Sequence, residues 1–255
     1  MTLLAPILLG LFGLAVGSFL NVCIHRLPRR ESLNFPASHC PSCSRPLAWY
    51  ENIPLASWIV LGGRCRTCRA PISPVYPAVE AITAALFVAG YFIYGLTPLL
   101  AARLLFACAM IVLFFIDLRH HLLPNVITLP GIASGFALSV VLPPGWRDSL
   151  IGLLAGGGIL FAIAETYYRV RGVEGLGMGD VKMLAMIGAF LGWQLMLVTL
   201  VLASVAGSLV GIGLMASGRG GMKAALPFGT FLAVGALVAA VAGDSLLDWY
   251  VGLYR

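Results

Sequence analysis

The chain has 255 residues, of which 60% are hydrophobic and only 10% are charged, and its mean hydropathy is +0.97. Soluble domains carry about 25% charged residues, so this composition excludes a soluble globular protein and indicates an integral membrane protein. The net charge of +6 does not indicate nucleic-acid binding, because the basic residues cluster in loops beside apolar runs.

Apolar runs of about 20 residues can cross a bilayer as helices. The first run, 3–24, follows no basic segment and has no small-residue cleavage site, so we interpret it as a retained span. The stretch 181–217 is long enough for two short spans with a turn near Gly192–Gln194. We therefore predict an all-α, polytopic protein of about eight transmembrane helices, the others covering 77–96, 98–116, 125–142, 149–167 and 227–246.

The loop between the first two predicted helices contains two C-x2-C pairs separated by 21 residues. This spacing is typical of a zinc ribbon with four cysteine ligands, and the neighbouring arginines favour thiolates. Two disulfides are the alternative, which a reducing cytoplasm disfavours. His39 is a second-choice ligand beside the first pair. We predict a structural zinc ion held by Cys40, Cys43, Cys65 and Cys68.

Eight spans place both termini on one side of the membrane. The face opposite the termini then receives 13 of the 16 Lys and Arg residues. When the long loop 25–76 is left out, this face still has six Lys and Arg residues, against three on the face of the termini. The positive-inside rule makes the face opposite the termini cytoplasmic. Outside the long loop, its basic residues are Arg119, Arg169, Arg171, Lys182, Arg219 and Lys223.

Two aspartates are predicted to lie at the cytoplasmic ends of spans. Asp117 follows the apolar run Met110–Ile116, and Asp180 precedes the run Val181–Ala189. An aspartate at a helix centre costs about 2.5–3.5 kcal/mol on insertion scales, so such residues are functional candidates. Two neighbouring carboxyl groups share a proton, and one can activate water while the other polarises a carbonyl. The simpler alternative is that each aspartate caps or solvates a helix end.

Three glycines precede Asp180 in the stretch GLGMGDVKM, residues 175–183. We expect Gly175, Gly177 and Gly179 to permit positive φ angles before the helix and close approach of an extended peptide.

Five motifs occur in a fixed order over about 180 residues: GSFLNVCIHRLP (17–28), the two C-x2-C pairs, YPAVE (76–80), D-x5-LPN (117–125) and GMGDVKM (177–183). Together they resemble the type IV prepilin peptidases, also called leader peptidase/N-methyltransferases. The chain departs from the family pattern at Asn125, where LPD is frequent, and at Val75, where an arginine commonly precedes Tyr-Pro. The second departure bears on methyl transfer rather than on cleavage.

The resemblance implies a bacterial inner-membrane aspartic peptidase of the GxGD type. Such enzymes cut the leader from type IV prepilins and type II secretion pseudopilins at the cytoplasmic edge of the bilayer, and many then methylate the new N-terminus with S-adenosylmethionine. By resemblance, Asp117 and Asp180 are the catalytic pair and the four cysteines are the metal site. Glu80 is a candidate for the methyl-transfer site, its alternative being an ordinary carboxylate at the membrane edge.

These implications divide the chain into a first helix (1–24), a cytoplasmic tetracysteine loop associated with methyl transfer (25–76) and a transmembrane peptidase core (77–255). The expected partners are prepilin or pseudopilin substrates and the lipid bilayer, without nucleic acid. A membrane transporter is the main alternative, although the sequence has no internal repeat and its acids lie at one edge. A non-catalytic, zinc-bearing membrane scaffold is a third interpretation.

Overall fold

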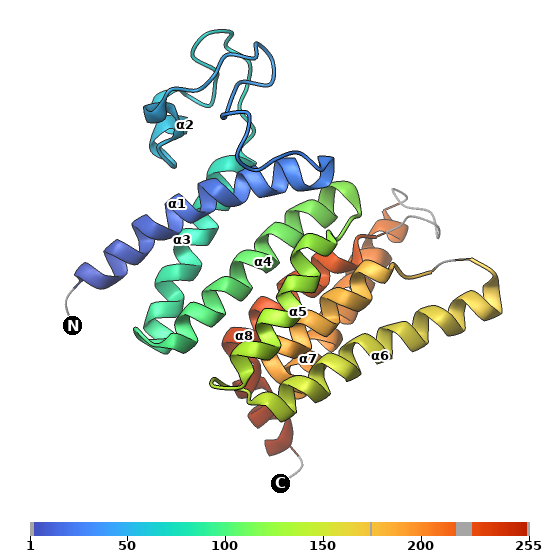
Figure 1. Ribbon diagram of the computed structural model, residues 1–255. Helices are drawn as coiled ribbons and strands as arrows, with labels where there is room; N and C mark the ends of the chain where they lie inside the picture. The colour runs from blue at the N-terminus through green and yellow to red at the C-terminus, as the bar shows by residue number, and fades with distance from the viewer. Residues whose placement is uncertain (1–2, 174, 218–225, 254–255) are drawn as a thin grey trace. The chain divides into compact units, whose positions relative to one another are not determined.

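The computed structural model describes residues 3–173, 175–217 and 226–253, and within these ranges every named element is a helix (Figure 1). Arg219 and Lys223, two of the basic residues predicted on the cytoplasmic face, lie outside the described residues. The chain divides into two compact units, Met1–Leu100 and Ala101–Arg255. The all-α prediction is confirmed for the described part of the chain.

Among the described residues, six helices are long and apolar enough to cross a membrane, which confirms a multi-pass membrane protein. The remaining apolar helix, α5 (Asn125–Ser139), has 15 residues. At 1.5 Å per residue it is about 22 Å long. It ends at Ser139, before the predicted bound at residue 142. The six are α1 (Leu4–Arg26), α3 (Val75–Tyr94), α4 (Pro98–His120), α6 (Trp146–Arg171), α7 (Met178–Ala216) and α8 (Phe228–Gly252).

In the first unit, α1 packs closely against α3 through small residues. A Cβ atom at Gly13 would lie 2.8 Å from the Cα of Ala84, and one at Gly17 would lie 2.7 Å from the Cα of Glu80. The side-chain amide of Asn21 donates a hydrogen bond to the carbonyl of Tyr76 at 3.0 Å. Small residues let the two backbones approach closely. Close packing is needed because lipid supplies no hydrophobic driving force for helix association. The two helices therefore form a tight antiparallel pair.

The connection between these helices contains only short elements: η1 (Leu27–Arg29), η2 (Trp49–Asn52) and α2 (Ala56–Val60). At its start, the buried guanidinium of Arg26 donates to the carbonyl oxygens of Ser32 at 2.8 Å and Pro36 at 2.6 Å. These bonds fix the direction in which the loop leaves α1.

In the second unit, α7 is interrupted at Gly192, where φ is 81° and ψ is 173°. A straight helix of 39 residues would extend about 58 Å, almost twice the hydrocarbon thickness of about 30 Å. Before the break, Gly188 lies against Gly152 of α6. After it, Leu195 lies against Gly243 of α8, and Gly211 lies against Leu226.

The contacts at both ends show that α7 reverses direction. Gly179 at the start of α7 and Gly229 at the start of α8 both lie against Leu123. Gly192 instead lies against Pro144, which precedes α6. Since α8 runs antiparallel to the second arm of α7, that arm returns to the Leu123 end, and α6, α7 and α8 pack side by side (Figure 1). The predicted turn near Gly192–Gln194 is confirmed, and the described apolar helical segments number eight.

The break in α7 frees backbone carbonyl groups that a continuous helix would pair internally. Ser149 Oγ donates to the carbonyl of Ala189 at 2.7 Å, and Arg103 Nη1 donates to that of Phe190 at 3.3 Å. An unsatisfied backbone group in lipid costs several kcal/mol. These two side chains therefore stabilise the turn.

The contact between α6 and α7 generates a stability prediction. Replacing Gly188 by alanine would place a Cβ atom only 2.1 Å from the carbonyl oxygen of Gly152, which is backbone and cannot move aside freely. We expect G188A to lower the free energy of unfolding by about 1–3 kcal/mol, measured by thermal or denaturant unfolding in detergent. The matched control is G158A on α6, where a Cβ atom meets nothing within 4 Å. Equal stability of the two variants would contradict the packing described here.

Candidate active site and metal centre

Asp117 lies in the last turn of α4, and its side chain is buried at 5% exposure. Its Oδ2 atom accepts two hydrogen bonds from Thr230, one from the backbone N–H at 2.7 Å and one from the hydroxyl at 3.1 Å. The same N–H also lies 3.2 Å from the carbonyl oxygen of Pro227. Thr230 belongs to the first turn of α8, where unpaired N–H groups favour a negative charge.

Asp180 lies in the first turn of α7 and is half-buried. Gly177 precedes this helix in an extended conformation, with φ −74° and ψ 141°. The backbone N–H of Asp180 donates to the carbonyl of Gly177 at 3.1 Å. A Cβ atom at Gly177 would contact Oδ2 of the Asp180 carboxylate at 3.4 Å. This is an ordinary van der Waals distance, so space alone does not require glycine at this position.

The two aspartates lie at the same end of the second unit, and their carboxyl groups interact electrostatically. Leu123, in the short turn between α4 and α5, connects them. A Cβ atom at Gly179 would lie 2.9 Å from the Leu123 side chain, and one at Gly229 would lie 2.9 Å from that side chain and 3.0 Å from Asp117 Oδ2. The structure thus brings together the two residues that the sequence singled out, and their catalytic role remains a prediction.

The glycines before Asp180 do not have the backbone conformation that was expected from the sequence. Positive φ angles among the described glycines occur elsewhere, and Gly175, Gly177 and Gly179 do not have them. Two of the three lie close to side chains instead: a Cβ atom at Gly175 would lie 2.4 Å from the ring of Tyr167, and one at Gly179 would lie 2.9 Å from Leu123 Cβ. The expectation of left-handed backbone was therefore wrong, because the segment enters the helix from an extended conformation.

Sequence reasoning missed Gly229 and Thr230. Their signal was the segment Pro227-Phe228-Gly229-Thr230 at the start of the last apolar run, which places a proline, a glycine and a hydroxyl residue in one helix entry. These residues gain significance only from the contact of α8 with α4, which no local pattern predicts.

The four cysteines of the first unit form one cluster, with all Sγ atoms within 4.8 Å of one another. The Sγ atoms of Cys40 and Cys68 are 3.7 Å apart. A tetrahedral ion with metal–sulfur bonds of about 2.3 Å separates its ligand atoms by about 3.8 Å. The donor set and the spacing therefore fit a four-coordinate metal ion.

The two cysteine pairs sit in turns that repeat the same backbone pattern 25 residues apart. The N–H of Cys40 bonds to the carbonyl of Arg45 at 2.9 Å, and the N–H of Cys65 bonds to that of Ala70 at 2.8 Å. Ser44 and Arg69 occupy equivalent left-handed positions, with φ of 55° and 58°. Each turn therefore aims two sulfur atoms at the same point.

Backbone donors favour thiolates in these turns. The N–H groups of Cys68 and Thr67 lower the pKa of the Cys65 thiol to about 6, and those of Cys43 and Ser42 lower the pKa of Cys40. His39 Nδ1 is instead paired with the carbonyl of Ala37 at 3.1 Å, and His39 is not part of the cluster found among the described residues.

An ion pair ties the first cysteine turn to η2. Arg45 Nη2 contacts both carboxylate oxygens of Glu51, at 2.7 Å and 2.8 Å, and the backbone N–H of Ala48 donates to Oε2 at 2.9 Å. The Arg45 guanidinium, helped by that N–H, holds the pKa of Glu51 below its ordinary value. This stabilisation is present at neutral pH and is lost as the pH falls through the lowered pKa.

Glu80, buried at 8% exposure in α3, reaches from the helix pair to the loop. Its Oε2 atom accepts the backbone N–H of Leu55 at 2.8 Å, and Ser18 of α1 lies beside the carboxylate. Leu55 has a positive φ of 57°, which a side chain disfavours. Beside these groups lies a shallow cavity of about 330 Å³, largely open to the surface and lined by Ala15, Ser18, Phe19 and Val22 of α1 and by Ser38, Asn52 and Pro54 of the loop.

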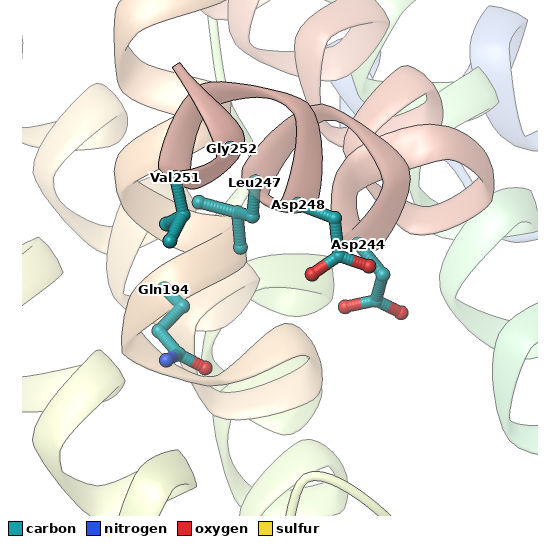
Figure 2. A pocket seen from close by; sticks show the side chains of 6 residues that line it. All are labelled: Gln194, Asp244, Leu247, Asp248, Val251 and Gly252. Carbon is teal, nitrogen blue, oxygen red and sulfur yellow. The ribbon is translucent and has the colours of Figure 1, made fainter. Parts of the chain in front are cut away.

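A larger cavity, of about 480 Å³, lies away from Asp117 and Asp180. Figure 2 shows the residues that line it. Its residue Gln194 follows the break at Gly192, whereas Asp117 and Asp180 lie at the Leu123 end. Figure 2 shows Gln194 on α7 opposite residues of α8, with Asp244 and Asp248 exposed at the rim. None of its lining residues was predicted as a site residue from the sequence.

Comparisons with known proteins match almost the whole chain. Residues 11–94 match the model of the bacterial peptidase A24 N-terminal domain, and residues 104–212 match that of the type IV leader peptidase family. No solved structure matches the chain.

Several curated relatives carry the name prepilin leader peptidase/N-methyltransferase. The protein of Aeromonas hydrophila is 39% identical over 271 residues, covering 96% of this chain and 93% of the relative. That of Pseudomonas aeruginosa is 36% identical and covers 94% and 91%. That of Myxococcus xanthus is 45% identical over 223 residues, covering 86% and 66%.

The cysteine cluster predicts one bound metal ion per chain. We expect Cys65→Ser to lose this ion, because a tetrahedral site loses a quarter of its ligands, and elemental analysis of the purified protein measures it. The control is Cys108→Ser in α4, outside the cluster, which should keep the metal content of the wild type. Equal metal content in both variants would show that the cluster is not the binding site.

Proposed function

The chain belongs to the prepilin leader peptidase/N-methyltransferase family, and we propose that it cleaves the leader of type IV prepilins or type II secretion pseudopilins and then methylates the new N-terminus. Matches over both family domains and over most of the length of several relatives support this proposal. They favour a peptidase over a transporter or a non-catalytic scaffold.

The observation that carries the peptidase half is the meeting of Asp117 and Asp180 at one end of the second unit. We infer that they form a catalytic pair. One carboxylate takes a proton from water, and the resulting hydroxide oxygen attacks the scissile carbonyl carbon. The other carboxyl group gives its proton to the carbonyl oxygen. Two adjacent carboxyl groups suit this exchange, because both cannot be ionised easily.

We place this site at the cytoplasmic edge of the bacterial inner membrane. The basic residues Arg119, Arg169, Arg171 and Lys182 lie at the end of the second unit that carries Asp117 and Asp180, as the positive-inside rule requires. A prepilin is itself anchored in this membrane with its leader in the cytoplasm, so the cut falls at that edge. Water is accessible there, as hydrolysis requires, and is excluded from the hydrocarbon core.

For the tetracysteine cluster we propose zinc, which prefers four thiolates in tetrahedral geometry. Bound there, the ion supplies folding energy to a loop that is too small to build a core of its own. Cys40, Cys43, Cys65 and Cys68 hold it.

We assign methyl transfer to the first unit and propose the cavity beside Glu80 as the site for S-adenosylmethionine. The cavity of about 330 Å³ falls in the size range of ligand pockets, and it offers the aromatic ring of Phe19 and the polar side chains of Ser18 and Asn52. Glu80 would contribute a carboxylate near a sulfonium ligand, and it ties the loop beside Pro54 to α3 through the backbone N–H of Leu55. This assignment extends the methyl-transfer region beyond the loop 25–76, because residues of α1 line the cavity and Glu80 lies in α3. Cleavage is assigned to the second unit, Ala101–Arg255.

The catalytic pair predicts that Asp117→Asn and Asp180→Asn each abolish cleavage, because an amide can neither take up nor release the required proton. Leader removal from a purified prepilin, followed by gel electrophoresis in detergent, measures it. Asp148→Asn, at the other end of the second unit, is the control and should cleave normally. If Asp117→Asn and Asp180→Asn, shown to be folded, cleave at the wild-type rate, the pair is not catalytic.

The methyl-transfer assignment predicts that Glu80→Gln loses methylation and keeps cleavage. Mass spectrometry of the mature N-terminus detects the methyl group, about 14 Da heavier than the unmodified product. The matched control is Glu165→Gln, where the carboxylate pairs with Arg169 in the same helix of the second unit. Loss of cleavage together with methylation, or full methylation by Glu80→Gln, would refute the assignment.

A further inference from the structure

The first turn of α8 does more than pack against α4. We propose that Thr230 is a positioning residue that fixes the Asp117 carboxylate and occupies its Oδ2 atom, so that Oδ1 is the oxygen that exchanges protons during cleavage. This inference rests on the proposed role of Asp117 in the catalytic pair.

Both hydrogen bonds from Thr230 end on the same oxygen. The N–H of Thr230 is 2.7 Å from Asp117 Oδ2, and its hydroxyl is 3.1 Å from the same atom. A carboxylate oxygen has two lone pairs in its plane, so both are taken by donors. Both residues are buried, at 5% and 7% exposure, so water does not compete freely for these bonds. Proton uptake therefore falls to Oδ1.

Glycine at position 229 permits this arrangement. A Cβ atom there would lie 3.0 Å from Asp117 Oδ2 and 2.9 Å from Leu123 Cδ1, so a side chain would displace the Asp117 carboxylate or the end of Leu123. The hydroxyl of Thr230 differs from the other buried threonine hydroxyls of the unit. Thr199 donates to the carbonyl of Leu195 and Thr128 to that of Pro124, each four residues earlier, whereas Thr230 bonds to a side chain 113 residues away.

The assignment specifies each proton in the reaction. Oδ1 of Asp117 takes a proton from water as the water oxygen bonds to the scissile carbonyl carbon, and the proton of Asp180 passes to the carbonyl oxygen. In the second step the carbon–nitrogen bond breaks, and the proton on Oδ1 goes to the leaving nitrogen. Asp180 regains its proton from a hydroxyl group of the tetrahedral intermediate, so both groups return to their initial states. Thr230 touches no reacting atom and acts only through Asp117.

The test compares four full-length proteins in detergent with a purified prepilin: wild type, Thr230→Val, Thr230→Ser and Thr199→Val. Thr230→Val removes the hydroxyl and keeps the backbone N–H and the branched shape. We expect kcat for cleavage to fall by about 10- to 100-fold, the usual effect of losing one hydrogen bond to a charged group, with KM unchanged. Thr230→Ser restores the donor and should restore kcat, and Thr199→Val removes a buried hydroxyl elsewhere and should leave kcat unchanged.

Wild-type kcat in Thr230→Val would overturn the inference, as would an equal loss in Thr230→Val and Thr230→Ser or an effect on KM alone. Should Thr230→Val not fold, Thr230→Ala removes the same hydroxyl without added apolar bulk and carries the same expectation. Asp117→Asn in the same assay distinguishes failure of the positioning role from failure of the proposed peptidase site. If it is inactive while Thr230→Val is normal, the catalytic pair stands and the positioning role fails; if it cleaves normally, the proposed peptidase site itself fails.

Discussion

The contact of Leu123 with two glycines is the constraint on which the second unit depends. Leu123 lies against Gly179 at the start of α7 and against Gly229 at the start of α8, so both helix N-termini are held at the end of α4. Asp117 and Asp180 are brought together by this contact, although 63 positions separate them in the sequence. Since helix N-termini stabilise negative charge, the arrangement keeps two carboxylates at a membrane edge where burial alone would disfavour them.

That arrangement also requires α7 to return to the end at which it began. The reversal at Gly192 supplies the return, and its freed carbonyl groups are paired by side chains of α4 and α6. Gly152 and Gly188 bring the backbones of α6 and α7 into direct contact. Lipid offers no alternative hydrogen-bond partner for backbone groups. The turn at Gly192 therefore needs both the side chains that pair its carbonyl groups and the close contact between Gly152 and Gly188.

Local sequence patterns predicted the helical class, the cysteine cluster and the turn near Gly192, because each depends on nearby residues. The helical class follows from the length of the apolar runs, and the cluster follows from the spacing of its ligands. The turn follows from a glycine within a run that is too long for one span. Local patterns also singled out Asp117 and Asp180, since charges are rare in such a chain. They could not predict Thr230, whose partner is 113 residues away, or the hydrogen bond from the backbone of Leu55 to Glu80. They misassigned the glycines before Asp180, because none of these has a positive φ and two of them lie close to Tyr167 and Leu123.

The repeated turns of the cysteine loop have a consequence for how that loop is assembled. Each turn supplies only two sulfur atoms, so neither can hold an ion without the other. The ion therefore closes a ring of chain from Cys40 to Cys68 and makes the ordering of both turns a single event. Ser38 and Asn52, which line the cavity beside α1, lie next to or within this ring. If methyl transfer belongs to the first unit, as proposed, loss of the metal ion would abolish methylation before cleavage. Cells that lack the metal would then accumulate pilins that have lost the leader but carry an unmethylated N-terminus.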